Sequence, residues 1–157
     1  MTFKNAVEKT PGLQHAWRSG IQALRGMDGQ HVDAEDARRL AGSVNVDAEL
    51  AQSHPNDARW DYAVGHRPAN CNGEVVYWIE IHPASSGAVK VVLAKLTWLK
   101  SWLQNSAPHL QAMEKAFVWV SSGKTSYTLS SPQQKRFALL GLRHKGRVFK
   151  IPNEAFA

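Results

Sequence analysis

The stretch VVYWIEIHPA (residues 75–84) decides the fold, because it is almost wholly apolar and yet carries one carboxylate, Glu80. A run of this kind is typical of a strand that is covered on both faces and lies near the centre of its sheet. The neighbouring run RWDYAVG (59–65) also reads as a strand and also carries one acid, Asp61. Burying a carboxylate without a partner is costly. The two acids therefore require a physical explanation.

The segments around these two strands predict an α/β domain. The run AVKVVLAKLTWLKSWL (88–103) has apolar residues at helical spacing, so we expect a helix from Ser85 or Ser86 to about Asn105 that covers one face of the sheet. Further helices are predicted over 6–25, 33–42 and 131–143, and further strands over 43–51, 115–122 and 146–151. The order α-α-β-β-β-α-β-α-β predicts a central mixed sheet of about five strands flanked by helices.

Length and composition predict one domain in a reducing compartment. A chain of 157 residues is expected to form a single domain, 1–157, with N-terminal helices in 1–42, a core in 43–122, and a C-terminal helix and strand in 123–157. No apolar run reaches the roughly 18 to 20 residues that span a bilayer. The N-terminus lacks the apolar core of a signal peptide, and the single cysteine, Cys71, excludes an internal disulfide framework. We expect a cytoplasmic protein with no membrane partner.

The charge favours a nucleic-acid partner. Nineteen Lys and Arg residues face thirteen Asp and Glu residues, which gives a net charge of +6, and the excess of positive charge lies toward the C-terminus. A basic surface attracts phosphate groups. The residues that we predict to contact nucleic acid are Lys124, Arg143, Lys145 and Arg147. Many proteins of similar charge bind no nucleic acid, so a protein partner is the alternative.

The two acids can form a metal site. Adjacent strands lie about 4.8 Å apart, so carboxylates at neighbouring heights on one face can share a cation. Alternate residues of a strand point to the same face, so Glu80 and His82 project together, with the Ile81 carbonyl between them. Hard divalent ions such as Mg²⁺ prefer oxygen ligands of this kind. A metal held there could activate a water molecule and offset charge on a phosphoryl group.

This arrangement resembles the PD-(D/E)XK nuclease family, which has the restriction-endonuclease-like fold. In that family an Asp begins the second core strand and an acid lies within the third, as Asp61 and Glu80 do over residues 43–122. The resemblance implies a nuclease that acts on DNA or RNA. It implies Mg²⁺ or Mn²⁺ as cofactor, with Asp61, Glu80 and the Ile81 carbonyl as metal ligands. The resemblance is also compatible with a homodimer, because two such sites can cut two strands.

The sequence departs from the family pattern where a lysine usually follows the second acid by two residues. His82 stands there, and could act as a general base, a metal ligand or a hydrogen-bonding neighbour. Some family members supply the lysine from the following helix, where Lys90 and Lys95 are candidates. Lys95 lies in the apolar stripe of that helix, so we include it with Asp61, Glu80 and His82 among the catalytic candidates.

Simpler interpretations stay open at this stage. Both helix lysines could be solvated, and the acids could sit at strand ends and pair with Arg59, His66 or a nearby lysine. The chain could then be a nuclease-like domain without catalytic activity that binds nucleic acid or a protein. It could also be an unrelated α/β domain in which the acids are structural.

Overall fold

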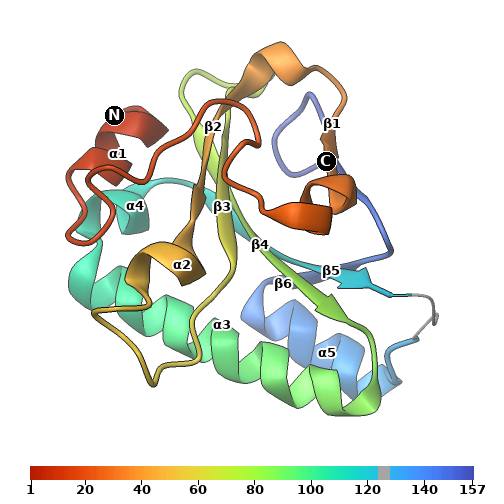
Figure 1. Cartoon of the computed structure of the whole chain (residues 1–157). Helices are drawn as coiled ribbons and strands as arrows, with labels where there is room; N and C mark the ends of the chain where they lie inside the picture. Colours follow the sequence, from red (N-terminus) through yellow and green to blue (C-terminus); the bar gives the residue numbers. More distant parts are fainter. Residues whose placement is uncertain (124–127) are drawn as a thin grey trace.

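A five-stranded mixed sheet forms the centre of the described part of the chain, residues 1–123 and 128–157 of the computed structural model (Figure 1). The strand order is β2-β3-β4-β5-β6. The bounds of these strands are Leu40–Asn45, Tyr62–His66, Val75–Pro83, Lys115–Ser122 and Leu142–Lys145. Strands β2, β3 and β4 form an antiparallel meander, and β5 and β6 continue the sheet parallel to β4. The predicted α/β class with a mixed central sheet is confirmed.

The fifth central strand is not the one that the sequence suggested. We predicted the final strand over 146–151 and extended the preceding helix to Arg143. Instead, helix α5 (Ser131–Leu140) ends at Gly141, whose φ of 72° places it in the left-handed conformation that commonly terminates helices. The chain then enters β6 directly. Strand β7 (Phe149–Ile151) pairs in parallel with β1 (Val32–Ala34) in a separate two-stranded sheet.

The helix that follows β4 is confirmed. Helix α3 covers Ser86–Ser106, and the Ser85 side chain caps it by accepting a hydrogen bond from the backbone N–H of Ala88. Its buried residues lie at helical spacing and pack against the sheet. The remaining helices are short: α1 (Phe3–Glu8), α2 (Val46–Leu50), α4 (Pro108–Ala112), and the 3₁₀ helices η1 (Gly26–His31) and η2 (Ala37–Arg39). Among the residues that the structure describes, none of the helices combines the length and the hydrophobicity that a membrane span requires.

The predicted N-terminal helices are largely wrong. Helix α1 ends at Glu8 instead of continuing to Arg25, because Pro11 disfavours helical backbone before it and Gly12 has a φ of 88°. The chain after Gly12 runs through turns and then lies against β2, where Arg18 and Ser43 exchange backbone hydrogen bonds. Residues 33–42 belong to β1, η2 and β2 in turn, and do not form the α-helix that we predict there. The element order therefore differs from the prediction at both ends of the chain.

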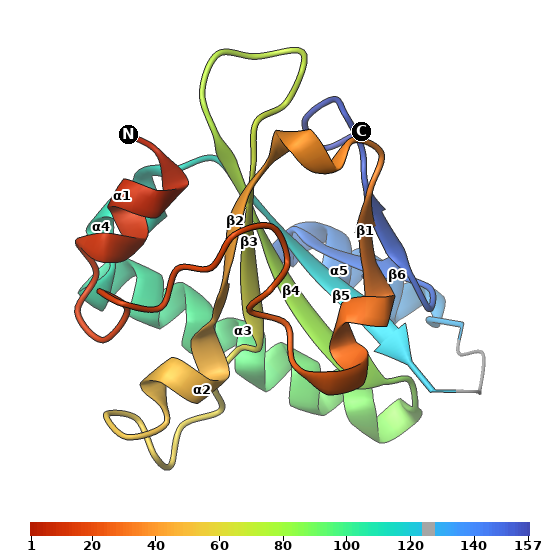
Figure 2. The same ribbon diagram turned by 45° about the horizontal axis from the view of Figure 1, so that its top comes forward.

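The two faces of the sheet have separate hydrophobic cores. One core includes Trp78 and Trp119, and helices α1, α3, α4 and α5 cover it. The other includes Tyr77 and Ile79, and the β1–β7 pair and the C-terminal tail cover it. Figure 2 shows the β1–β7 pair and the tail together on the side of the sheet away from α3. Side chains of β4 therefore alternate between the two cores, and Glu80 shares the α3 face with Trp78.

Candidate functional site

Asp61 and Glu80 meet at the point where the pairing of β3 with β4 ends. The last pair in this register is Tyr62 with Ile79. Asp61 lies directly before β3, and Glu80 is the next residue of β4. The backbone N–H of Asp61 donates to Glu80 Oε1 at 3.2 Å, and the N–H of Ile81 donates to Asp61 Oδ2 at 3.0 Å. Each carboxylate is thus held by the backbone of the other strand.

The remaining oxygen of each carboxylate is directed at Lys95 on α3. The Lys95 ammonium donates to Asp61 Oδ1 at 3.0 Å and also to Glu80 Oε2. One oxygen of each carboxylate therefore accepts a hydrogen bond from the same atom, Lys95 Nζ. The structure brings together three of the four predicted catalytic residues, Asp61, Glu80 and Lys95, and one of the simpler interpretations, pairing of the acids with a nearby lysine, is also fulfilled.

These charges are largely removed from water. Glu80 is fully buried, and the side chains of Asp61 and Lys95 are only 19% and 15% exposed. Burial raises the pKa of Glu80 well above its usual value, and the Asp61 carboxylate raises it further, against the opposing effect of Lys95. Burial also raises the pKa of Asp61, although Lys95 counteracts it. The carboxylates therefore retain protons to higher pH than solvated carboxylates do.

Lys95 responds in the opposite sense. Burial alone would lower the pKa of its ammonium, but the Glu80 and Asp61 carboxylates outweigh burial and raise it. Lys95 is therefore a stable cation in this site.

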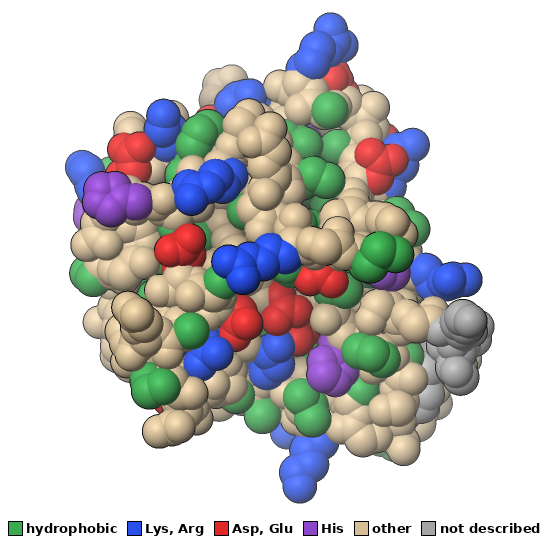
Figure 3. Space-filling model, in the orientation of Figure 1, with side chains coloured by type: hydrophobic (Ala, Val, Ile, Leu, Met, Phe, Trp, Pro, Cys, Tyr) green, Lys and Arg blue, Asp and Glu red, His purple; other side chains and the backbone are tan. Residues whose placement is uncertain are grey.

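His82 lies at the edge of the cluster. Its Nδ1 atom is 3.8 Å from Glu80 Oε2, and its side chain is 31% exposed. Burial, and then the Lys95 charge, lower the pKa of His82, which favours a neutral imidazole at pH 7. Figure 3 shows acidic, basic and histidine side chains together near the centre of this face, over the strands beside α3.

Other candidates lie elsewhere. Arg59 pairs with Asp47 at 3.0 Å, and His66 lies at the far end of β3, where it pairs with Val75. On β6, Arg143 and Lys145 lie in register with Val118 and Val120 of β5. These two valines belong to the core on the face of the sheet away from α3, so the two basic residues lie on that face as well. The predicted phosphate contact Arg147 is exposed in the turn before β7, and Lys124 lies outside the described residues.

A third acid, Asp47, was missed by the sequence reasoning. The backbone N–H groups of Val46 and Asp47 donate to the Asp61 carbonyl at 2.9 Å and 3.3 Å. The charge of Asp47 adds a minor contribution to the raised pKa of Asp61, behind that of burial. We read this segment as a strand, whereas Asn45 begins helix α2 by accepting a hydrogen bond from Ala48 N–H. An Asn at that position is a helix-capping signal that the apolar alternation concealed.

The donor atoms of the cluster suit a hard divalent cation. Asp61 Oδ1 and Glu80 Oε2 already converge on a cation, and carboxylate oxygens are the ligands that Mg²⁺ and Mn²⁺ prefer. Magnesium is commonly held by only one or two carboxylates, with water completing its shell. Within the described residues, no three acidic, histidine or cysteine side chains gather into a metal-binding group. A metal bound here would therefore rest on these two carboxylates and would replace the Lys95 ammonium between them.

Comparisons with protein-family models, curated proteins and solved structures found no match to this chain.

Proposed function

We propose that this protein is a metal-dependent phosphodiesterase, a nuclease that acts on DNA or RNA, built on a restriction-endonuclease-like core. The observation that carries the proposal is the convergence of Asp61, Glu80 and Lys95 from β3, β4 and α3 on one point. The antiparallel meander, covering helix and parallel fourth strand are the arrangement that the PD-(D/E)XK resemblance implies. Lys95 on α3 would correspond to the lysine that some members of that family supply from the helix after the third core strand.

Each residue has a role that follows from its position. Asp61 and Glu80 would hold Mg²⁺ or Mn²⁺, with the Ile81 carbonyl as a further oxygen ligand. A metal in this site would supply an activated water and would offset charge on the phosphoryl group. Lys95 has a long flexible stem, so its ammonium can leave the acids and contact a phosphate oxygen. Neutral His82 at the exposed edge can accept a proton from the attacking water.

The charge of the cluster couples substrate binding to metal binding. When ionised, two carboxylates and one ammonium carry a net negative charge, which repels phosphate. The Lys95 ammonium cannot move away unless another cation replaces it, because the fully buried Glu80 carboxylate would otherwise have no cationic partner. A divalent cation held by Asp61 and Glu80 would balance their two charges, and the released Lys95 ammonium would then add a positive charge that attracts phosphate.

One observation favours a second candidate, a nucleic-acid-binding domain without catalytic activity. Lys95 already donates a hydrogen bond to each of the two acids, so both carboxylates have a cationic partner without a metal. The excess of basic residues toward the C-terminus would then supply phosphate contacts. This candidate predicts binding that weakens steeply with salt, and neither cleavage nor a response to Mg²⁺.

A cleavage assay with a nicked and an intact DNA duplex, single-stranded DNA and RNA, each with Mg²⁺, Mn²⁺ or EDTA, tests the proposal. We expect metal-dependent cleavage that falls at least about 100-fold in Asp61→Asn, Glu80→Gln and Lys95→Met. Lys90→Met is the matched control, because Lys90 lies exposed on the same helix. Metal-independent binding without cleavage in the wild-type protein would favour the second candidate and reject the first.

A further inference from the structure

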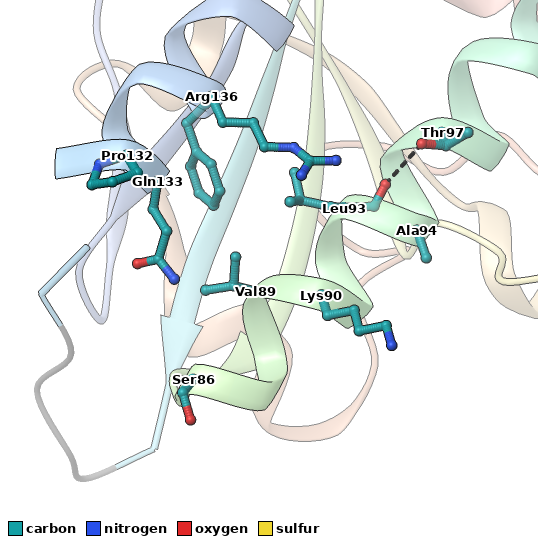
Figure 4. Close-up of a pocket in the computed structure, with 10 residues that line it drawn as sticks. Ser86, Val89, Lys90, Leu93, Ala94, Thr97, Pro132, Gln133 and Arg136 are labelled. Carbon is teal, nitrogen blue, oxygen red and sulfur yellow. Dashed lines mark hydrogen bonds between the residues drawn. The ribbon is translucent and has the colours of Figure 1, made fainter. Parts of the chain in front are cut away.

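A groove of about 660 Å³ runs between α3 and α5 on the outside of the molecule. In Figure 4, Val89 and Leu93 project from α3 into this groove, and Arg136 extends from α5 toward Leu93. Phe137 of α5 is almost fully buried and forms part of the floor. The groove therefore has an apolar floor between two parallel walls of helix, and basic side chains at its rim.

The charge along these two helices has a single sign. The chain has no Asp or Glu between Glu80 and Glu114, and none between Glu114 and Glu154. The cations on the two helices are Lys90, Lys95, Lys100, Lys135 and Arg136. Lys95 is held by the acid pair, and Lys100 donates to the carbonyl of Leu140. Among the described residues, Lys90 and Arg136 at the groove have no ion-pair partner, so the rim offers uncompensated positive charge.

We propose that this groove, separately from the acid cluster, binds an acidic amphipathic helix of a partner protein. A helix that lies in a groove between two helices places apolar residues on the floor and polar residues at the rim. The apolar floor of this groove is complementary to the apolar face of such a helix. Lys90 and Arg136 are complementary to carboxylates that flank that face.

Two other occupants fit less well. A second copy of this chain would bring α3 and α5 of both copies together, and these helices carry only positive charge. A nucleic-acid backbone would satisfy Lys90 and Arg136 but would leave the floor at Leu93 and Phe137 unmatched.

The groove and the acid cluster lie on different sides of α3. Successive residues of a helix are separated by about 100°, so Leu93 and Lys95 point about 200° apart. Lys95 contacts Asp61 and Glu80, whereas Leu93 lines the groove. A partner in the groove therefore contacts α3 without touching the acids, and binding can be tested independently of any cleavage.

The probe is a synthetic helical peptide of about 18 residues, about five turns, with leucines at i, i+3, i+4 and i+7 and glutamates elsewhere. We expect saturable binding in fluorescence anisotropy. Arg136→Glu and Ala94→Glu, each at an exposed position at the groove, should weaken it at least about tenfold, and Ala94→Lys should not. Lys150→Glu, an exposed basic residue on β7, is the control for the loss of positive charge. Unchanged thermal unfolding shows that each variant is folded.

The controls separate the alternatives. A peptide of the same composition, scrambled so that it has no apolar face, should bind at least about tenfold more weakly. Equal binding of the scrambled peptide, loss of binding in Lys150→Glu, or no saturable binding would overturn the proposal. If Arg136→Glu weakens single-stranded DNA binding but not peptide binding, the groove contacts nucleic acid instead. Groove variants should retain the metal-dependent cleavage of the wild-type protein, and absence of cleavage in the wild-type protein leaves the peptide result unaffected.

Discussion

Lys95 and Glu80 join α3 to β4 through a buried ion pair, in which the ammonium donates to a carboxylate oxygen that has no contact with solvent. The desolvation of two buried charges offsets most of their attraction, so such a pair adds little net stability. Removal of one partner is different, because the other charge stays buried and uncompensated. The relationship therefore predicts a large and pH-dependent effect of mutating either residue.

Lys95→Met should destabilise the protein by about 3 kcal/mol at pH 8, because it leaves two adjacent carboxylates without their cation. The loss should be smaller at pH 5, where Glu80 can take up a proton and remove the buried charge. Urea unfolding at the two pH values measures both effects. Lys90→Met, an exposed residue of the same helix, should change stability by less than about 0.5 kcal/mol. Equal losses at pH 5 and pH 8 for Lys95→Met would contradict the prediction.

Glu80→Gln should gain stability relative to the wild-type protein as the pH rises. Burial raises the pKa of Glu80 above the value of 4.5 that applies in the unfolded chain, so the folded state holds a proton that the unfolded state has lost. Wild-type stability therefore falls between pH 4.5 and the raised pKa, by up to about 1.4 kcal/mol per pH unit. Glutamine has no such titration and keeps an oxygen for the Asp61 N–H.

Urea midpoints from pH 4 to pH 8 measure this difference between Glu80→Gln and the wild-type protein. Glu49→Gln, the same substitution at an exposed position, is the matched control. A difference that shrinks as the pH rises would mean that the folded protein stabilises the charged form of Glu80.

The central strands and helix α3 could be predicted from the sequence because the apolar residues of these segments are the ones that the fold buries. The apolar run of β4 is buried on both faces, and the apolar stripe of α3 packs on the sheet, so hydrophobic pattern and tertiary environment agree. The convergence of Asp61 with Glu80 follows from adjacent strands in register. Lys95 was harder to predict, because periodicity places its stem near the core but does not show which atoms its ammonium meets.

The ends of the chain could not be predicted in the same way. Leu13, Trp17 and Leu24 have helical spacing by coincidence. Leu13 and Leu24 are buried in different cores, and the Trp17 indole donates to the Ala41 carbonyl, so the three residues do not share a helical face. The strand β1 is only three residues long and depends on β7, which lies more than 100 residues later in the chain. Local pattern carries no information about such a partner.

Gly42→Ala should destabilise the fold by more than about 3 kcal/mol. A Cβ atom at Gly42 would lie 2.1 Å from Trp17 Nε1 and 2.8 Å from the carbonyl oxygen of Arg18, and its φ of 113° strains any other residue. The indole N–H of Trp17 also donates to Ala41, so this side chain cannot move away without losing a hydrogen bond. Thermal and urea unfolding measure the loss. Gly87→Ala is the control, because the position is open and helical, and a stable Gly42→Ala variant would show that this N-terminal segment is not fixed on β2.

Lys95→Met should bind Mn²⁺ more tightly than the wild-type protein while it loses cleavage. The Lys95 ammonium occupies the two carboxylate oxygens that the metal would use, so its removal ends a direct competition. Calorimetric titration with Mn²⁺ at pH 8 should show an affinity at least about tenfold higher in Lys95→Met, and no binding in Asp61→Asn. Wild-type affinity should fall from pH 8 to pH 6, because the raised pKa of Glu80 keeps a proton on the acid pair that the metal must displace. Weaker Mn²⁺ binding in Lys95→Met would show that the lysine supports a metal site elsewhere and does not compete for these oxygens.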